Sequence, residues 1–294
     1  MSEPEILRPR LWRWIAGLFF ILCSWLIAGS ILTVATAFIF GLDVVALTGT
    51  DESSRQTLAS YPPWQSGISI LISFLPLLLS SVIAYRFFLN RPLLDLFADR
   101  RNLKMGRIGR GAAVMSALLL VTSVPDLIFN RADYKFTFDL GSFLPYLLMA
   151  LIFIPLQTSS EELFFRGYIQ RWLDNGRRSI WIVATCNGLL FAAPHLANPE
   201  VKGELIAAVI SYGSTGFMLS WVTFRDRGME LALGAHAANN LLAGLVVTSS
   251  DSALPAASMW TTPEVAWGPA SIVSIVMIPL FIWLTRKPAD KVAV

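Results

Sequence analysis

Long apolar runs separated by short polar or charged breaks make up most of the chain. A helix needs about 20 apolar residues to cross the hydrocarbon core of a bilayer, and runs of this length recur along the whole sequence. The pattern therefore predicts an all-α, polytopic membrane bundle of about eight transmembrane helices. Their predicted ranges are 16–41, 65–88, 108–129, 141–165, 179–197, 204–223, 231–249 and 266–285. The first run is too long for a cleaved signal peptide, so we expect it to be retained as a span.

Composition and charge agree with this prediction. The chain is 55% hydrophobic and 15% charged, with a mean hydropathy of +0.60, which is far more apolar than a soluble domain. The basic residues are concentrated in alternate loops. All but four of the 23 lysine and arginine residues lie in loops on one side of the predicted topology, the exceptions being Arg55, Arg131, Lys135 and Lys202. This bias places both termini in the cytoplasm, and it explains the net charge of +3 without a nucleic-acid partner.

No internal repeat or soluble domain interrupts the apolar pattern. We divide the chain into an N-terminal transmembrane region of three spans (1–140), a core that carries the polar motifs (141–250), and a last span with a cytoplasmic tail (251–294). The two cysteines, Cys23 and Cys186, both lie in apolar runs and indicate neither a disulfide framework nor a cysteine metal site.

Three ionisable residues stand at the end of the fourth predicted span. Glu161, Glu162 and Arg166 follow an apolar run that begins near Phe143. Ionisable groups at membrane depth are costly and are retained mostly for function. On a helix, Glu162 and Arg166 lie four residues apart and can pair. Glu161 points about 100° away from Glu162, so its partner must come from another helix.

The chain contains only two histidines, and each lies in a different later span. His195 follows Phe191 by one helical turn. If the chain turns around residues 175–179, Glu161 and His195 are equally far from the turn and should face each other across a helical hairpin. In the seventh span, His236 and Asn240 share one helix face, and the neighbouring residues are small enough for close helix packing.

These residues resemble the three signature motifs of the CPBP intramembrane proteases. The motifs are Glu-Glu-x-x-x-Arg (Glu161, Glu162, Arg166), Phe-x-x-x-His (Phe191, His195) and His-x-x-x-Asn (His236, Asn240), in this order on three apolar helices. The group includes the type II CAAX prenyl endopeptidases and bacterial Abi-type proteins linked to bacteriocin immunity. The resemblance covers about residues 145–250.

The resemblance implies an endopeptidase that acts on a protein or peptide substrate at or in the membrane. In such an enzyme Glu161 and His195 would activate a water molecule, and His236 and Asn240 would stabilise the tetrahedral oxyanion. A carboxylate beside a histidine suits a general base, and preorganised N–H donors suit a developing negative charge. The resemblance leaves Glu162, Arg166 and Phe191 in supporting roles. It also implies a bacterial source, with the chain in the inner membrane.

A zinc ion is the main alternative within this reading. Glu161, His195 and His236 could hold zinc and leave a position open for water. However, the chain has no His-Glu-x-x-His motif, and Asn240 suits hydrogen bonding better than metal ligation. We therefore favour a metal-free reaction.

A non-catalytic protein could use the same polar cluster. Buried acids and histidines also occur in proton-coupled transporters, and an immunity factor or scaffold could use them for binding. The absence of an inverted repeat argues against transport. A further polar patch, Tyr212, Ser214 and Thr215 between two glycines, could either line a substrate groove or allow close helix packing. The sequence does not indicate the substrate, whether the substrate is prenylated, or the oligomeric state.

Overall fold

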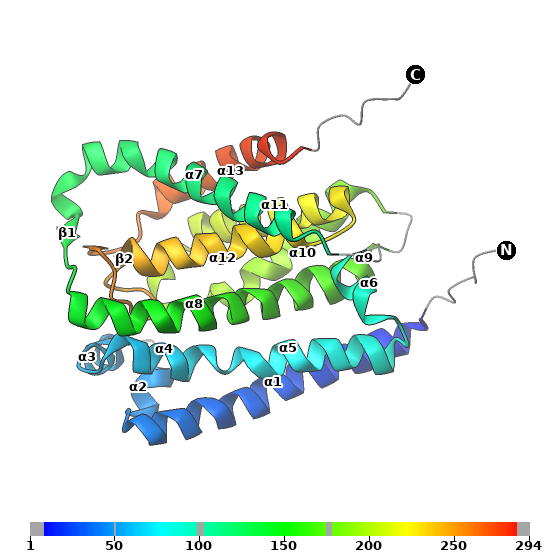
Figure 1. Cartoon of the computed structure of the whole chain (residues 1–294), viewed down its shortest axis with the longest axis horizontal. Helices are drawn as coiled ribbons and strands as arrows, with labels where there is room; N and C mark the ends of the chain where they lie inside the picture. Colours follow the sequence, from blue (N-terminus) through cyan, green and yellow to red (C-terminus); the bar gives the residue numbers. More distant parts are fainter. Residues whose placement is uncertain (1–8, 50, 99–102, 175–177, 287–294) are drawn as a thin grey trace.

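The computed structural model describes residues 9–49, 51–98, 103–174 and 178–286, and these residues are mostly helical (Figure 1). The centre of the predicted turn between the fourth and fifth spans, residues 175–177, lies outside the described residues. The same holds for six of the basic residues used to predict the topology: Arg8, Arg100, Arg101, Arg177, Lys287 and Lys291.

The elements follow one another as a series of helices with short connections. The first part comprises α1 (Leu11–Phe40), α2 (Val44–Thr48), α3 (Glu52–Ala59), α4 (Pro63–Leu71), α5 (Phe74–Ile83), the π-helical turn η1 (Ala84–Phe88), α6 (Leu93–Phe97), α7 (Met105–Phe129), the 3-10 turn η2 (Arg131–Asp133) and β1 (Lys135–Phe136). The second part comprises α8 (Leu140–Glu162), the π-helical turn η3 (Leu163–Ile169), α9 (Gln170–Leu173), α10 (Ile180–His195), the 3-10 turn η4 (Pro199–Val201), α11 (Leu205–Asp226), α12 (Glu230–Leu245), β2 (Val247–Ser249), β3 (Trp260–Thr262) and α13 (Trp267–Leu284).

Six of the predicted spans are helices long and apolar enough to cross a membrane, which makes the chain an integral membrane protein. These helical stretches are Leu11–Phe40, Pro63–Phe88, Met105–Phe129, Leu140–Leu173, Leu205–Asp226 and Trp267–Leu284. The fifth and seventh predicted spans form α10 and α12, which have 16 residues each. A helix of that length extends about 24 Å, less than the roughly 30 Å of a bilayer core. The prediction of helices at all eight places is confirmed, and the number of membrane crossings remains a prediction.

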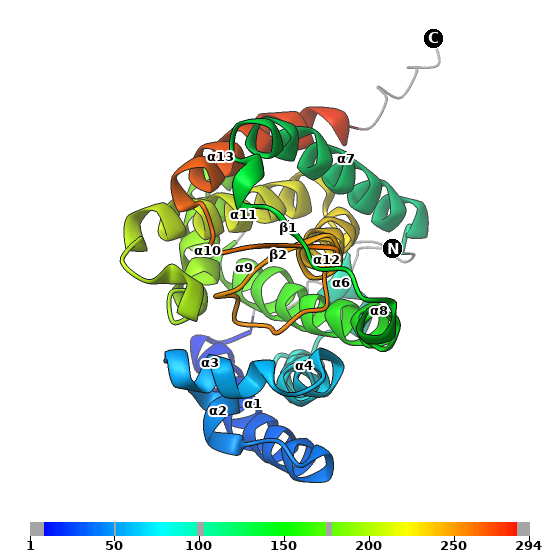
Figure 2. The ribbon, with the colours of Figure 1, turned by 90° about the vertical axis from the view of Figure 1, so that its left-hand side faces the viewer.

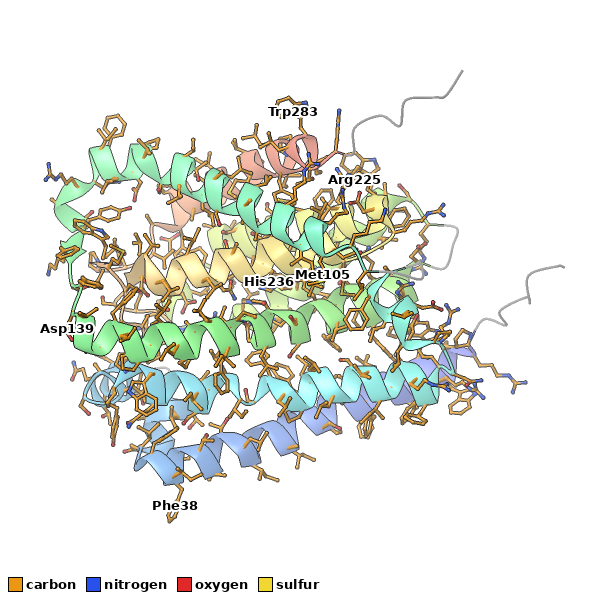
Figure 3. The ribbon with its side chains drawn as sticks, viewed as in Figure 1. Phe38, Met105, Asp139, Arg225, His236 and Trp283 are labelled. Carbon is orange, nitrogen blue, oxygen red and sulfur yellow. The ribbon has the colours of Figure 1, made fainter. Side chains whose placement is uncertain are left out.

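The outer surface of the bundle carries large apolar side chains. Phe38 is 87% exposed and Phe129 is 83% exposed. Figure 3 shows Phe38 and Trp283 pointing away from the helices. Such side chains would be costly in water and are expected where a helix faces lipid.

The helices form two groups on opposite sides of α8. On one side α1 packs against α4 and α5, which in turn pack against α8 (Figure 2). On the other side α12 packs against both α8 and α7, while α11 packs against α10 and α13. The third predicted span, α7, therefore lies with the polar-motif helices in space, although it precedes them in sequence.

Glycines let α7 and α12 approach closely. A Cβ atom at Gly234 would overlap the backbone carbonyl oxygen of Ile108, and a Cβ at Gly111 would overlap that of Leu231. Small residues at a helix interface allow this backbone contact. The close approach fixes α12, and with it the histidine that α12 carries.

The two ends of the bundle are built differently. One end is covered by a small sheet of strand order β1-β3-β2, with β1 antiparallel and β2 parallel to β3. We call this the sheet end. At the opposite end Arg107, from the start of α7, pairs with Asp226 at the end of α11 and donates to the carbonyl of Thr285 after α13. Helix α1 begins and α13 ends toward this opposite end (Figure 1).

Candidate active site

The two adjacent glutamates end α8, and a π-helical turn follows them at once. Glu161 and Glu162 are the last two residues of α8, and Arg166 lies within η3. A π-turn adds a residue to the helical repeat and redirects the side chains that follow it, and such turns are frequent at functional sites. Here the turn lies directly after the carboxylates, so it sets where the guanidinium points.

Glu162 lies at the centre of a dry cluster. Its Oε1 accepts hydrogen bonds from Arg166 Nη1 at 3.0 Å and from His236 Nδ1 at 2.8 Å. The side chains of Glu162 and Arg166 are fully buried. Arg166 also donates to the carbonyl of Gly216 at 3.2 Å and lies 4.6 Å from the ring centroid of Phe191. Such additional partners offset part of the cost of burying both charges, although Glu162 Oε2 and Arg166 Nε are buried without a hydrogen bond in the described part of the chain.

Glu161 faces the other edge of the same imidazole. Its Oε2 lies 3.4 Å from His236 Nε2, which is an ion-pairing distance, yet within the described part of the chain this buried oxygen has no hydrogen-bond partner. A carboxylate and an unprotonated ring nitrogen repel each other, so this approach is favourable only when one of the two atoms carries a proton. The ring of His236 therefore connects Glu162 on one side with Glu161 on the other.

His195 is the last residue of α10, one turn after Phe191. Its Nδ1 lies 2.8 Å from the carbonyl oxygen of Phe191. Because a carbonyl oxygen only accepts hydrogen bonds, Nδ1 must carry a proton, and in the neutral ring the lone pair is then on Nε2. The ring also packs against two aromatic rings, Phe191 at 4.7 Å and Tyr212 at 4.6 Å between centroids.

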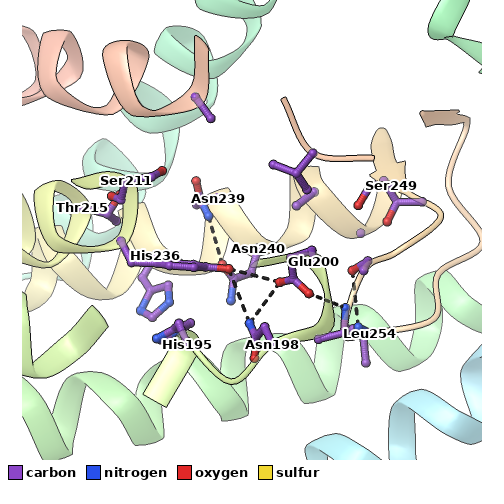
Figure 4. Close-up of a pocket in the computed structure, with 18 of the residues that line it drawn as sticks. His195, Asn198, Glu200, Ser211, Thr215, His236, Asn239, Asn240, Ser249 and Leu254 are labelled. Carbon is purple, nitrogen blue, oxygen red and sulfur yellow. Dashed lines mark hydrogen bonds between the residues drawn. The ribbon is translucent and has the colours of Figure 1, made fainter. Parts of the chain in front are cut away.

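Asn240 extends the site by one helical turn along α12. Its side-chain Nδ2 donates to Gln157 Oε1 at 3.1 Å, and its Oδ1 accepts a hydrogen bond from Asn239 at 3.0 Å. In Figure 4 Asn239, Asn240 and His236 follow one another along α12, and His195 lies beside His236. The amide group of Asn240 is thereby held in a fixed orientation.

One large cavity connects these side chains. It has a volume of about 1220 Å³, and it is lined by Glu161, His195, His236 and Asn240. Neither Glu162 nor Arg166 is among its described lining residues. The cavity continues to the sheet end, and the described residues that line it include no lysine or arginine. Its carboxylates are Asp126, Asp133, Glu161, Glu200 and Glu264. The described lining of the cavity thus contains acidic side chains but no lysine or arginine, and Arg166 is buried outside it.

Comparison with known proteins agrees with this arrangement. Residues 141–242 match the sequence profile described as type II CAAX prenyl endopeptidase Rce1-like, and all seven motif residues fall inside the match. The chain carries an Rce1-like domain. The chain is also 29% identical over 215 residues to the uncharacterized protein YyaK of Bacillus subtilis (strain 168), a match that covers 71% of this chain and 72% of YyaK.

The Rce1-like domain brings all seven predicted site residues together, but the contacts differ from the prediction in one respect. We expected His195 to face Glu161 across the hairpin. The ionisable partner of Glu161 is instead His236 on α12. His195 meets the carbonyl of Phe191 in its own helix. Equal depth in a hairpin places two residues at the same level, but it does not determine which helix face each side chain occupies.

Zinc does not fit the donors of the Rce1-like domain as they are arranged. In the described ranges no three histidine, cysteine or carboxylate side chains converge closely enough to hold a metal ion. The Nδ1 atoms of His236 and His195 are bonded to Glu162 and to a carbonyl, so only their Nε2 atoms could face a metal ion. Proteins usually hold zinc with three or four convergent ligands.

Sequence reasoning missed two polar side chains of this Rce1-like site. Gln157 lies one helical turn before Glu161 on the same face of α8, and this i, i+4 spacing could have revealed it. Glu200 follows the end of α10 in a short connection and lines the cavity. No helical spacing relates Glu200 to the motifs, so only the fold reveals it. Of the polar patch in the sixth span, Tyr212 and Thr215 line the cavity.

Proposed function

We propose that the protein is an intramembrane endopeptidase that hydrolyses a peptide bond in a protein or peptide substrate at or in the membrane. One observation carries this proposal: Glu161, His195 and Asn240 reach the same cavity from three different helices. Two ionisable groups and a fixed amide around one space are what acid–base attack of water on a carbonyl group requires.

In this proposal Glu161 is the general base. The Glu161 side chain lines the cavity, so its carboxylate can take a proton from a water molecule there. His195 offers the Nε2 lone pair as a second acceptor because its Nδ1 proton is bonded to Phe191.

His236 and Asn240 would stabilise the oxyanion. Asn240 Nδ2 carries two protons, of which one is bonded to Gln157. His236 presents an N–H at Nε2 when its ring is protonated, because its Nδ1 proton is bonded to Glu162. Glu162 and Arg166 would act behind them, because Glu162 accepts from His236 Nδ1 and so fixes the direction of Nε2. These roles match the motif roles that the resemblance implies.

The placement in the membrane is also a proposal. We infer eight crossings, with α10 and α12 as short spans inside the bundle, both termini in the cytoplasm and the chain in a bacterial inner membrane. The bias of basic residues and the common end of α1 and α13 support this topology. The relative from Bacillus subtilis supports a bacterial source.

The test is cleavage of a quenched-fluorescent peptide library by the purified full chain, in detergent and again in proteoliposomes. Glu161→Gln keeps the shape but removes the base, and we expect cleavage to fall by about 10²- to 10⁴-fold. Glu264→Gln is the matched control, because Glu264 lines the same cavity away from the cluster. We expect the wild-type rate to persist in a zinc chelator. Equal rates for wild type and Glu161→Gln, or no cleavage by either preparation, would favour a scaffold or a proton-coupled transporter.

A further inference from the structure

A tyrosine outside the three motifs packs against His195. The ring of Tyr212, on α11, lies 4.6 Å from the imidazole centroid, and the two planes are inclined by 32°. On the same tyrosine the hydroxyl donates to Glu200 Oε1 at 3.1 Å. Tyr212 therefore connects a carboxylate on the connection after α10 to a histidine at the end of α10.

Glu200 holds four hydrogen bonds from different parts of the chain. Its Oε1 accepts from Tyr212 and, at 3.0 Å, from Asn198 Nδ2. Its Oε2 accepts from the backbone amide of Ala253 at 3.0 Å, and its backbone carbonyl accepts from Trp267 Nε1 at 2.7 Å. Figure 4 shows Asn198 and Glu200 in the cavity, on the side of His195 toward Leu254. A carboxylate with three donors is fixed in orientation, and it fixes its donors in turn.

This anchoring limits the freedom of the His195 ring. The torsion that turns an imidazole has broad minima, so packing and hydrogen bonds must select its orientation. One restraint is the carbonyl of Phe191, which accepts from Nδ1 at 2.8 Å. The other is the ring of Tyr212, which Trp267 also contacts at 5.5 Å between centroids. Together they keep Nδ1 on the carbonyl and leave Nε2 available to the cavity.

We propose that Glu200 and Tyr212 are positioning residues for His195. Glu200 fixes the hydroxyl of Tyr212, and the Tyr212 ring fixes the imidazole in the tautomer that carries its proton on Nδ1. The effect on the tautomer stands independently of any activity. The effect on the reaction rests on the proposed function, because it requires His195 Nε2 to act on the water or substrate.

The chain allows a direct measurement, because it contains only two histidines. Full-length protein labelled with ring ¹⁵N-histidine in lipid nanodiscs gives two imidazoles, and His236→Gln identifies the signals of His195. For the wild type at a pH where His195 is neutral, we expect a protonated Nδ1 and an unprotonated Nε2. A dominant Nε2-protonated form would overturn the proposal.

Substitutions separate positioning from simple packing. Tyr212→Leu removes the ring, and we expect His195 to become a mixture of both tautomers. Tyr212→Phe keeps the ring but loses the hydroxyl, and should give a smaller change in the His195 spectrum.

Glu200→Ala should resemble Tyr212→Phe, whereas Glu200→Gln should restore most of the wild-type spectrum because its amide oxygen can still accept from Tyr212. The matched control is Tyr134→Phe: the Tyr134 hydroxyl also donates to a carboxylate, that of Asp126, and Tyr134 lines the same cavity.

Each outcome decides between the proposals. If Tyr212→Leu does not fold, the Glu200→Ala and Glu200→Gln pair carries the test. An unchanged His195 spectrum in folded variants would overturn the positioning role. If the spectrum changes as expected, kcat should fall by about 10-fold at an unchanged KM, since a small misplacement of a catalytic group lowers the rate. If the His195 spectrum changes but kcat does not, the effect of the two residues on the reaction is wrong, while their effect on the tautomer stands. If the wild-type protein cleaves nothing, the proposed function is contradicted, and the spectra still test the effect on the tautomer.

Discussion

Glu161 and Glu162 are adjacent in sequence but occupy opposite environments. The carboxylate of Glu162 is fully buried and its Oε1 accepts from Arg166 and His236, whereas Glu161 lines a cavity of about 1220 Å³. The ring of His236 separates the two carboxylates. One residue step along a helix, about 100°, is enough to create this difference.

The comparison shows that a glutamate can stabilise the fold on one side of a helix, while a glutamate on the other side is placed for chemistry. A buried charge with several donors stabilises its surroundings only as long as every partner is present. A carboxylate that lines a cavity can meet water or substrate, so it is available to bind a proton. We therefore expect substitutions on the Glu162 side to change folding, and substitutions on the Glu161 side to change activity.

The largest effect should come from Glu162→Ala. This change leaves the guanidinium of Arg166 buried without its carboxylate, and removing one partner of a buried ion pair costs about 3–5 kcal/mol. We expect a strong decrease of the melting temperature in detergent and poor yield of folded protein. The double variant Glu162→Ala/Arg166→Met should recover part of this loss because no charge is left unpaired. A melting temperature unchanged in the single variant would contradict the structural role of Glu162.

On the cavity side, Asn240→Ala should lower kcat rather than stability. Loss of one oxyanion donor reduces kcat by about 10²- to 10³-fold. Asn239→Ala is the matched control on the same helix, because Asn239 lines the same cavity and donates to Asn240 at 3.0 Å but is not one of the proposed oxyanion donors. Cleavage assays on both variants, with melting curves alongside, test the difference. Equal losses of kcat in the two variants would exclude a specific role for Asn240.

A smaller effect is expected from the helix contact that holds His236 between the two carboxylates. Gly234→Ala places a Cβ against the backbone carbonyl of Ile108, and overpacking of this kind costs about 1–3 kcal/mol. Gly109→Ala in α7 is the control, because a Cβ at Gly109 meets no atom within 4 Å. Thermal unfolding of the two variants should differ clearly. A similar melting temperature for both would mean that α7 and α12 are further apart than the structure indicates.

The helices and the ion pair of Glu162 with Arg166 could be predicted from the sequence because both depend on local patterns. Apolar runs of span length marked all eight helical places, and the pairing of Glu162 with Arg166 follows from helical spacing. The partner of Glu161 could not be predicted in this way. It depends on how α12 packs beside α8, and the same apolar pattern allows several rotations of a helix about its axis.

The remaining features depend on connections and on packing between distant segments. Glu200 lies in a short turn after α10, and its importance arises from contacts with Tyr212 and Ala253 that are far away in sequence. The position of α7 beside α12 likewise follows from a backbone contact at Gly234. Neither contact has a periodic signal, so no reading of apolar patterns could reveal it.

The smallest effect should come from a carboxylate that is exposed to water. Asp51 caps α3 and accepts from the amide of Ser54 at 3.0 Å and its hydroxyl at 2.8 Å. The hydroxyl of Ser53 and these contacts with Ser54 hold the pKa of Asp51 well below its usual range. The pKa of Asp51 is lower in the folded state than in the unfolded state, where it is about 3.9. The stabilisation that its hydrogen bonds provide is therefore complete above about pH 3.9 and is lost as the pH falls through the pKa of the folded state. In Asp51→Ala we expect faster amide hydrogen exchange in α3 at about pH 7, a difference from wild type that shrinks below about pH 4, and an unchanged global melting temperature. If Asp51→Ala lowered the melting temperature as much as Glu162→Ala, burial would not explain why the two carboxylates contribute differently to stability.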